Sequence, residues 1–300
     1  MSQILYRVEH ETHYEYAHPV SSSRQLVHLT PRDTPRQQTL DHRIVIAPVP
    51  SERAVRQDYF GNLLEQFTVS TAHDTLTVVA ASTVDVTRRF DAGTPSSPSW
   101  ERVRERLRQV GPAPLLEPSQ FLYASPHIEP LAVLARYARL DFHRERPLLE
   151  AASALMQRIH RDFEFDPEAT TVGTPLETLL KKRRGVCQDF AHFMIGCLRA
   201  LGLSARYVSG YLLTRPPPGQ ARLIGADASH AWVSVFCPGA GWVDFDPTNC
   251  VRPGDQHITV AWGRDFSDVT PMRGVILGGG EHAVEVSVTV TPLSVAAGQE

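Results

Sequence analysis

The sequence has 300 residues, of which 42% are hydrophobic and 21% are charged, and its formal net charge is -3 with the histidines counted as neutral. This composition is typical of a folded protein of one or two domains and argues against a disordered chain. So small a charge gives no basic field to gather nucleic acid or anionic lipid. No apolar run reaches the roughly 18 residues of a membrane span, and the polar N-terminus lacks the features of a secretory signal, so we expect a cytoplasmic protein without nucleic-acid or membrane partners.

The first ninety residues predict a β-sandwich-like domain. Short segments mix aromatic and β-branched residues with polar ones, as half-buried strands do. These segments span residues 4–8, 12–16, 43–46, 64–69 and 76–86. Residues 58–62, DYFGN, have the composition of a tight turn. Residues 91–99, DAGTPSSPS, have the composition of a linker, so we place an N-terminal β domain at 1–90 and a linker at 91–99.

Beyond the linker, the spacing of apolar residues changes to three and four, which indicates helices. The expected helices span residues 100–110, 130–140, 148–163, 174–182 and 187–201. Strands are expected again at residues 205–214, 231–236, 241–245 and 284–290, and the last of these should return to one of the sheets. The predicted fold class is therefore α+β, with a second domain of helices and strands at 100–300.

Cys187 is the most informative of the four cysteines, which also include Cys197, Cys237 and Cys250. No CxxC pair occurs, which disfavours a zinc site or a redox dithiol, and no disulfide is expected. Cys187 lies in the first turn of a predicted helix, where unpaired N–H groups and the helix dipole favour a thiolate and can stabilise an oxyanion. A small buried cysteine at a helix start explains the same segment equally well.

A histidine and an acid lie on two strands that follow this helix. His230 begins one strand, and Asp246 ends the next. A hairpin centred on Pro238 would place His230 opposite Asp246, with both side chains on one face. Cysteine, histidine and an acid that orients the imidazole form a generalised catalytic triad. Asp244 lies on the same face and is an alternative acid, and a merely hydrogen-bonded structural role remains an alternative for His230.

Together these segments resemble the transglutaminase-like (papain-like) superfamily, and more narrowly the bacterial transglutaminase-like proteins with an extra N-terminal β domain. The resemblance covers almost the whole chain. It is carried by RRGVCQDFAHFMIGCLRALGLSARYVSGYL, DASHAWVSVFCPGAGWVDFDPTN and AWGRDFSDVTPMRGVILGGG, and by DYFGNLLEQFTV after IAPVP. It implies a papain-like catalytic domain at 100–300, in which a helix carrying Cys187 packs on an antiparallel sheet carrying His230 and Asp246. By position, Cys187 is the nucleophile, His230 the base and Asp246 the orienting acid.

The resemblance also implies a reaction, namely acyl transfer from an amide or peptide carbonyl through a thioester. Water as the acceptor gives a peptidase or amidase, and an amine gives protein-glutamine amine transfer; hydrolysis is slightly preferred. We expect a peptide or protein substrate, a possible amine acceptor, no cofactor and no metal. The alternative is a catalytically idle protein-binding module that retains the fold.

Trp232, Tyr211 and Trp242 are candidates for the walls of a substrate cleft, together with the loop at 216–225. The backbone N–H of Cys187 is the expected oxyanion donor, and a second donor is not assigned. Exposed edge strands of the β domain would permit a homodimer.

Overall fold

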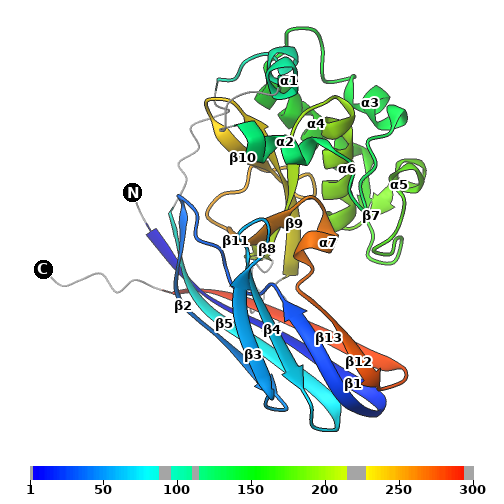
Figure 1. Ribbon diagram of the computed structural model, residues 1–300. Helices are drawn as coiled ribbons and strands as arrows, with labels where there is room; N and C mark the ends of the chain where they lie inside the picture. The colour runs from blue at the N-terminus through cyan, green and yellow to red at the C-terminus, as the bar shows by residue number, and fades with distance from the viewer. Residues whose placement is uncertain (1–2, 88–95, 110–114, 215–227, 294–300) are drawn as a thin grey trace, which may run out of the picture.

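Figure 1 shows the computed structural model of the protein, in which the helices and a small sheet gather at one end and a β domain forms the other. The structure describes residues 3–87, 96–109, 115–214 and 228–293. Most of the predicted linker and the proposed cleft loop at 216–225 lie outside the described residues. Among the helices in these ranges, none combines the length and apolar character needed to cross a membrane.

The elements follow the predicted order of strands, helices and strands. The described strands are β1 (Gln3–Val27), β2 (Gln37–Ala47), β3 (Glu52–Gln57), β4 (Leu63–Val69), β5 (His73–Thr87), β6 (Glu164–Phe165), β7 (Arg184–Gly185), β8 (Ala205–Leu212), β9 (Ala228–Cys237), β10 (Gly241–Phe245), β11 (His257–Gly263), β12 (Met272–Gly278) and β13 (His282–Leu293). The described helices are α1 (Trp100–Arg108), α2 (Leu116–Ser119), η2 (Gln120–Leu122), α3 (Ala132–Ala138), α4 (Leu148–Asp162), α5 (Leu176–Lys182), α6 (Cys187–Ala200) and α7 (Phe266–Val269). Each predicted helix is present within a few residues of its expected bounds.

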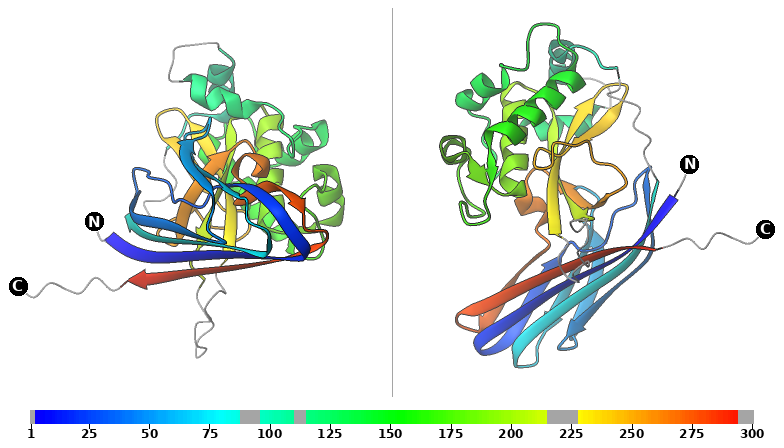
Figure 2. Two further views of the ribbon diagram at one scale, coloured as in Figure 1. Left: turned by 60° about the horizontal axis from the view of Figure 1, so that its bottom comes forward. Right: turned by 180° about the vertical axis from the view of Figure 1, so that it is seen from behind.

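The β domain is built around β1, which Figure 2 shows running along its whole length. The separate strands predicted at 4–8 and 12–16 are wrong, because both are parts of this one strand of 25 residues. No turn residues separate them, so nothing in the sequence stops the strand. Its first part pairs with β5 and β13, its last part pairs with β4 and β12, and the pairing with β5 shifts register between Glu15 and Val20. The sandwich-like domain is therefore one bent sheet around its own core.

The last two strands of the chain belong to this first sheet. Strand β13 pairs with β1 from Leu5↔Leu293 to Tyr16↔His282, and β12 pairs with the far end of β1. The prediction that 284–290 returns to a sheet is confirmed. The predicted range of 100–300 for the second domain thus includes two strands of the first sheet.

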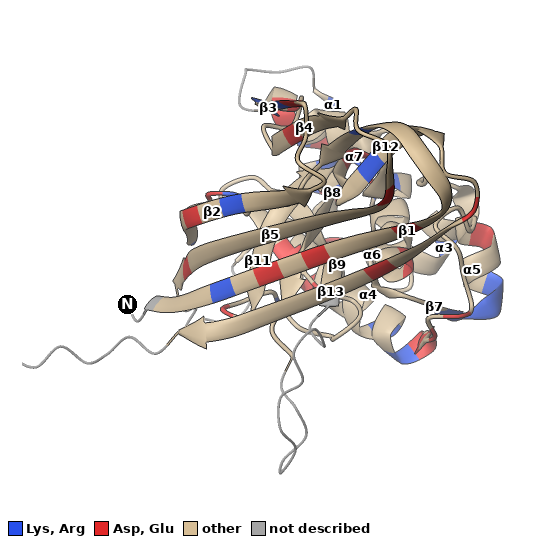
Figure 3. Ribbon diagram, turned by 90° about the horizontal axis from the view of Figure 1, so that it is seen from below, with Lys and Arg blue, Asp and Glu red and all other residues tan. Residues whose placement is uncertain are grey.

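The two faces of β1 have different surroundings. Arg7, Glu9 and Glu11 are exposed, and the outer face of the sheet carries charges of both signs (Figure 3). Tyr6 and Val8 alternate with them and are buried in a core that includes residues of the second domain. The two domains therefore share a hydrophobic core, which fixes one against the other.

The second domain places α6 against a four-stranded sheet of order β10-β9-β8-β11. Helices α3, α4 and α5 also contact α6, and most α6 side chains are buried. Every second residue of β9, including Val233 and Val235, joins the core with α6. His230 and Trp232 therefore lie on the opposite face of the sheet, toward the β domain.

The β9–β10 hairpin has a different centre from the predicted one. Cys237 pairs with Gly241 and Val233 pairs with Phe245, so the turn is centred on Gly239. Gly239 and Gly241 have φ values of 93° and 73°, which only glycine adopts readily. The predicted centre at Pro238 is wrong, and His230 and Asp246 are diagonal neighbours rather than opposed.

Candidate active site

Cys187 is the first residue of α6, and local hydrogen bonds fix where this helix begins. The Asp189 side chain accepts a hydrogen bond from the Val186 backbone N–H at 2.9 Å and one from the Thr170 hydroxyl at 2.6 Å. A Cβ on Gly185 would lie 2.7 Å from the same carboxylate oxygen, so the cap requires glycine there. Cys187 is half-buried at this capped N-terminus, where helix N–H groups are unpaired.

His230 and Asp246 contact each other, and Cys187 lies near His230. His230 Nε2 donates a hydrogen bond to Asp246 Oδ2 at 2.7 Å, and the Asp246 side chain is fully buried. The Cys187 side chain lies close enough to His230 to contribute to the raised pKa of the imidazole. The structure therefore brings all three predicted triad residues together.

The charged forms of His230 and Asp246 stabilise each other, as the shifts in their pKa values indicate. Burial lowers the pKa of His230, but the hydrogen bonds and negative charges of Asp246 and Cys187 outweigh it and raise that pKa to about 10. Burial raises the pKa of Asp246, but hydrogen bonds from His230 and His257 outweigh it and lower that pKa well below its usual range. At neutral pH the pair is therefore an imidazolium and a carboxylate.

Two further residues hold Asp246, and the sequence analysis missed both. His257, the first residue of β11, donates from Nε2 to Asp246 Oδ2 at 3.1 Å, and the Asn249 amide donates to the same oxygen at 2.8 Å. The other oxygen, Oδ1, accepts the backbone N–H groups of Thr248 and Asn249 at 2.9 and 3.1 Å. The pattern that could have revealed His257 is a histidine at the start of an alternating strand, as at His230. The alternative acid, Asp244, lines a cavity instead.

His230, Asp246 and His257 also offer three metal-ligand atoms within 4.8 Å of one another. Two imidazole nitrogens and a carboxylate are a donor set that zinc accepts. Both Nε2 atoms here donate N–H hydrogen bonds to the carboxylate. A metal would have to replace these hydrogen bonds, so the arrangement fits an oriented base better than a metal centre.

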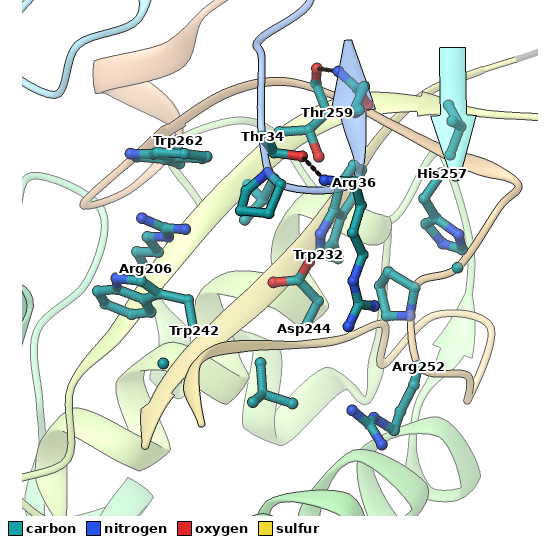
Figure 4. Close-up of a pocket in the computed structure, with 18 of the residues that line it drawn as sticks. Thr34, Arg36, Arg206, Trp232, Trp242, Asp244, Arg252, His257, Thr259 and Trp262 are labelled. Carbon is teal, nitrogen blue, oxygen red and sulfur yellow. Dashed lines mark hydrogen bonds between the residues drawn. The ribbon is translucent and has the colours of Figure 1, made fainter. Parts of the chain in front are cut away.

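The three candidate cleft residues lie in two different places. Tyr211 is buried between the domains, where its hydroxyl and His10 Nδ1 form a hydrogen bond of 2.9 Å. Trp232 and Trp242 line a cavity of about 670 Å³ between the β domain and the sheet face opposite α6 (Figure 4). Tyr211 is not among the residues that line this cavity.

Comparison with known proteins agrees with this geometry. The bacterial transglutaminase-like N-terminal region matches residues 6–85, and the transglutaminase-like superfamily matches residues 138–247. The second match contains Cys187, His230 and Asp246.

Several individual proteins are similar to this chain. The uncharacterized protein Rv2569c of Mycobacterium tuberculosis is 41% identical over 296 residues, which cover 96% of this chain and 92% of that protein. A protein-glutamine gamma-glutamyltransferase of Pseudomonas aeruginosa is 33% identical over 136 residues, only 44% of this chain and 20% of that protein. The crystal structure of a proposed cysteine protease from Cytophaga hutchinsonii has a TM-score of 0.76 at 20% identity and covers 98% of this chain and 92% of its own, which confirms the predicted fold class. The chain thus belongs to the bacterial transglutaminase-like proteins of the transglutaminase-like superfamily.

Proposed function

We propose that this protein is a cysteine enzyme that transfers an acyl group from an amide or peptide carbonyl through a thioester on Cys187. The observation that carries the proposal is the hydrogen bond of 2.7 Å from His230 to the buried Asp246, with Cys187 near enough to His230 to help raise the pKa of its imidazole. The thiolate is the nucleophilic form of cysteine, and an imidazole beside the sulfur is the group that exchanges a proton with it in the proposed reaction. A buried cysteine with only a packing role would not need a histidine oriented by a carboxylate beside it.

The proposed reaction uses each triad residue in turn. The Cys187 thiolate attacks the carbonyl carbon, and the backbone N–H of Cys187 is positioned at the helix start to donate to the oxyanion. The His230 imidazolium protonates the departing nitrogen, which leaves as ammonia or an amine and gives the thioester. The neutral His230 then takes a proton from the attacking water or amine, and the C–S bond breaks to restore the thiolate. Asp246 stays ionised throughout and holds the imidazole in place.

Water and an amine both fit as the second substrate, and we favour water. Cys187 is half-buried rather than enclosed, so water can reach a thioester on its sulfur. The amine-transfer alternative is supported by the partial similarity to the Pseudomonas transferase. In either case we propose a peptide or protein as the acyl donor.

A peptide carrying a glutamine side chain distinguishes these outcomes. The purified chain is incubated with the peptide and a dansylated primary amine, while ammonia release and amine incorporation are measured separately. Hydrolysis of the side-chain amide predicts ammonia without incorporation, hydrolysis of a peptide bond predicts a shortened peptide without ammonia, and amine transfer predicts both ammonia and incorporation. The control is Cys250→Ala, because Cys250 is also half-buried but burial raises the pKa of its thiol. Turnover that persists in Cys187→Ala contradicts the proposed nucleophile, and an unreactive Cys187 favours the idle binding module.

A further inference from the structure

Strand β11 begins with His257 and is the outermost strand of the four-stranded sheet in the part of the chain that the structure describes. One edge of β11 pairs with β8, and this pairing shifts register between Thr259 and Ala261. A shift of this kind inserts one residue, so the outward backbone groups of Thr259 and Trp262 point to the same free edge. Proteins usually cover such an edge, because its N–H and C=O groups are unpaired. Here the β domain covers it with two side-chain amides.

Gln37, the first residue of β2, holds β11 at Thr259. Its Nε2 donates to the Thr259 carbonyl at 2.7 Å, and its Oε1 accepts the Thr259 backbone N–H at 2.8 Å. The same Nε2 donates to the Arg32 carbonyl at 2.7 Å. Gln37 is buried, its backbone pairs with Thr34, and Figure 4 shows Thr34 close to Thr259. The amide therefore bonds both backbone groups of Thr259, as a neighbouring strand would.

Asn62, the last residue of the segment DYFGN, holds β11 at Trp262 in the same way. Its Nδ2 donates to the Trp262 carbonyl at 2.8 Å, and its Oδ1 accepts the Trp262 backbone N–H at 3.0 Å. Asn62 is also buried, and its amide bonds Asp58 at 2.8 Å and Arg32 at 2.7 Å. The two amides thus make matched contacts with β11, at different distances from His257.

Only the contact of Gln37 lies near His257. Thr259 follows His257 by two residues, about 7 Å along a strand, whereas Trp262 follows it by five, about 17 Å, and lies beyond the register shift. His257 Nε2 donates to Asp246 Oδ2 at 3.1 Å, near the long end of the usual range of about 2.7 to 3.2 Å. A displacement of this end of β11 by about 0.5 Å would therefore break the bond.

We propose that Gln37 is a positioning residue for the triad, because it holds β11 at Thr259 and so keeps His257 bonded to Asp246. The β domain would then take part in the site without supplying a catalytic residue. The contact stands on its own geometry, and its meaning for catalysis rests on the proposed function. Asn62 is the matched comparison, because two amides that only cover the edge would be interchangeable.

Nuclear magnetic resonance of ¹⁵N-labelled protein follows the bond from His257 without any substrate. A ring N–H that donates to a buried carboxylate is protected from exchange with water, and the His257 proton is assigned by its absence in His257→Phe. Gln37→Met and Asn62→Leu each replace an amide by an apolar side chain of similar size. We expect the proton in the wild type and in Asn62→Leu, and we expect Gln37→Met to lose it or to exchange it at least about tenfold faster.

Backbone N–H groups of β8 serve as the control, because their exchange reports any general loss of stability. If Gln37→Met does not fold, Gln37→Asn draws the amide back by one carbon and should give the same result. The proposal is overturned if the wild type shows no such proton, if the Gln37 variant keeps it, or if Asn62→Leu loses it as readily.

Alkylation of Cys187 by iodoacetamide connects the contact to the triad. Gln37→Met should shift the pH dependence of the rate in the same direction as His257→Phe. It should cause no further shift in a protein that already carries His257→Phe, because Gln37 acts through His257. Shifts that add together would overturn this route. A wild-type Cys187 that is not alkylated would count against the proposed function instead, and the His257 proton would still decide the role of Gln37.

Discussion

Replacing Asp246 by asparagine removes the negative charge that holds His230 protonated while keeping the shape of the side chain. The pKa of His230 is raised from 6.5 to about 10, against the opposing effect of burial. A rise of this size corresponds to roughly 5 kcal/mol in favour of the imidazolium. Asp246 and Cys187 share that effect, and one hydrogen bond to a charged group contributes about 1.5 to 3 kcal/mol. The substitution should therefore lower the pKa of His230 by about 1 to 2.

Nuclear magnetic resonance of histidine labelled with ¹⁵N measures this directly and needs no substrate. The His230 signals are assigned by their loss in His230→Gln, and the titration is compared between the wild type and Asp246→Asn. The wild-type ring should titrate near pH 10 and the variant clearly lower. A wild-type His230 that titrates near 6.5, or a variant with an unchanged pKa, would refute the reasoning. Acyl transfer should fall by up to about 10⁴-fold in the variant, as when the acid of a triad is replaced.

The same pKa makes a prediction about stability. The folded-state pKa of His230 is higher than its unfolded value, so its stabilising contribution is complete below about pH 6.5 and is lost as the pH rises through about 10. The lowered pKa of Asp246 has the opposite sign, and its contribution is lost as the pH falls into the acid range. Urea unfolding of the wild type and His230→Gln should differ more at pH 6 than above pH 10. An equal difference at both pH values would contradict the raised pKa.

Three further substitutions test separate parts of the site. Cys187→Ala should abolish alkylation by iodoacetamide near neutral pH, whereas Cys250→Ala should leave its rate unchanged; peptide mass spectrometry distinguishes the two thiols. His257→Phe removes one of the hydrogen bonds that lower the pKa of the buried Asp246. The rate of alkylation of Cys187 by iodoacetamide should therefore begin to fall at a higher pH as the solution is acidified. An unchanged pH dependence would contradict a role for His257 in keeping Asp246 ionised. Gly210→Ala would place a methyl group 2.5 Å from the Trp232 ring. The free energy of unfolding in urea should therefore fall by about 3 kcal/mol. A fall of less than about 1 kcal/mol would show that the strand relaxes to make room for the methyl group.

Local features of the sequence were sufficient to predict the helix that carries Cys187. Gly185 and the apolar spacing that follows it mark the start of α6, and Gly202 ends it with a φ of 76°. The hairpin was predicted on the correct face but with the wrong centre. The turn contains Pro238 and Gly239 and is followed by Gly241, the first residue of β10. Proline cannot adopt a positive φ and both glycines do, but the order of these residues did not show that Gly239 is the centre of the turn. Because the change of centre keeps the alternation, His230 and Asp246 still lie on one face.

What the sequence did not predict depends on contacts between distant segments. Strand β11 was missed, and with it His257, whose role arises only when β11 pairs with β8 and lies beside Asp246. The pairing of β1 with β12 and β13 joins residues more than 200 positions apart. Tyr211 was expected to line a cleft, but it lies next to His10 of the β domain. This contact depends on how the two domains pack, which the sequence does not show. A histidine at the start of an alternating strand is the one local feature that could have revealed His257, whereas the strand pairing and domain packing behind these contacts have no local signature in the chain.

Formation of a thioester on Cys187 tests the central claim most directly. The protein is mixed with p-nitrophenyl acetate near neutral pH, quenched in acid, digested and analysed by mass spectrometry. We predict one acetyl group on the peptide that contains Cys187, removable by hydroxylamine and formed much more slowly in His230→Gln. Acetylation at other residues only, or an equal rate in His230→Gln, would contradict a nucleophile activated by His230.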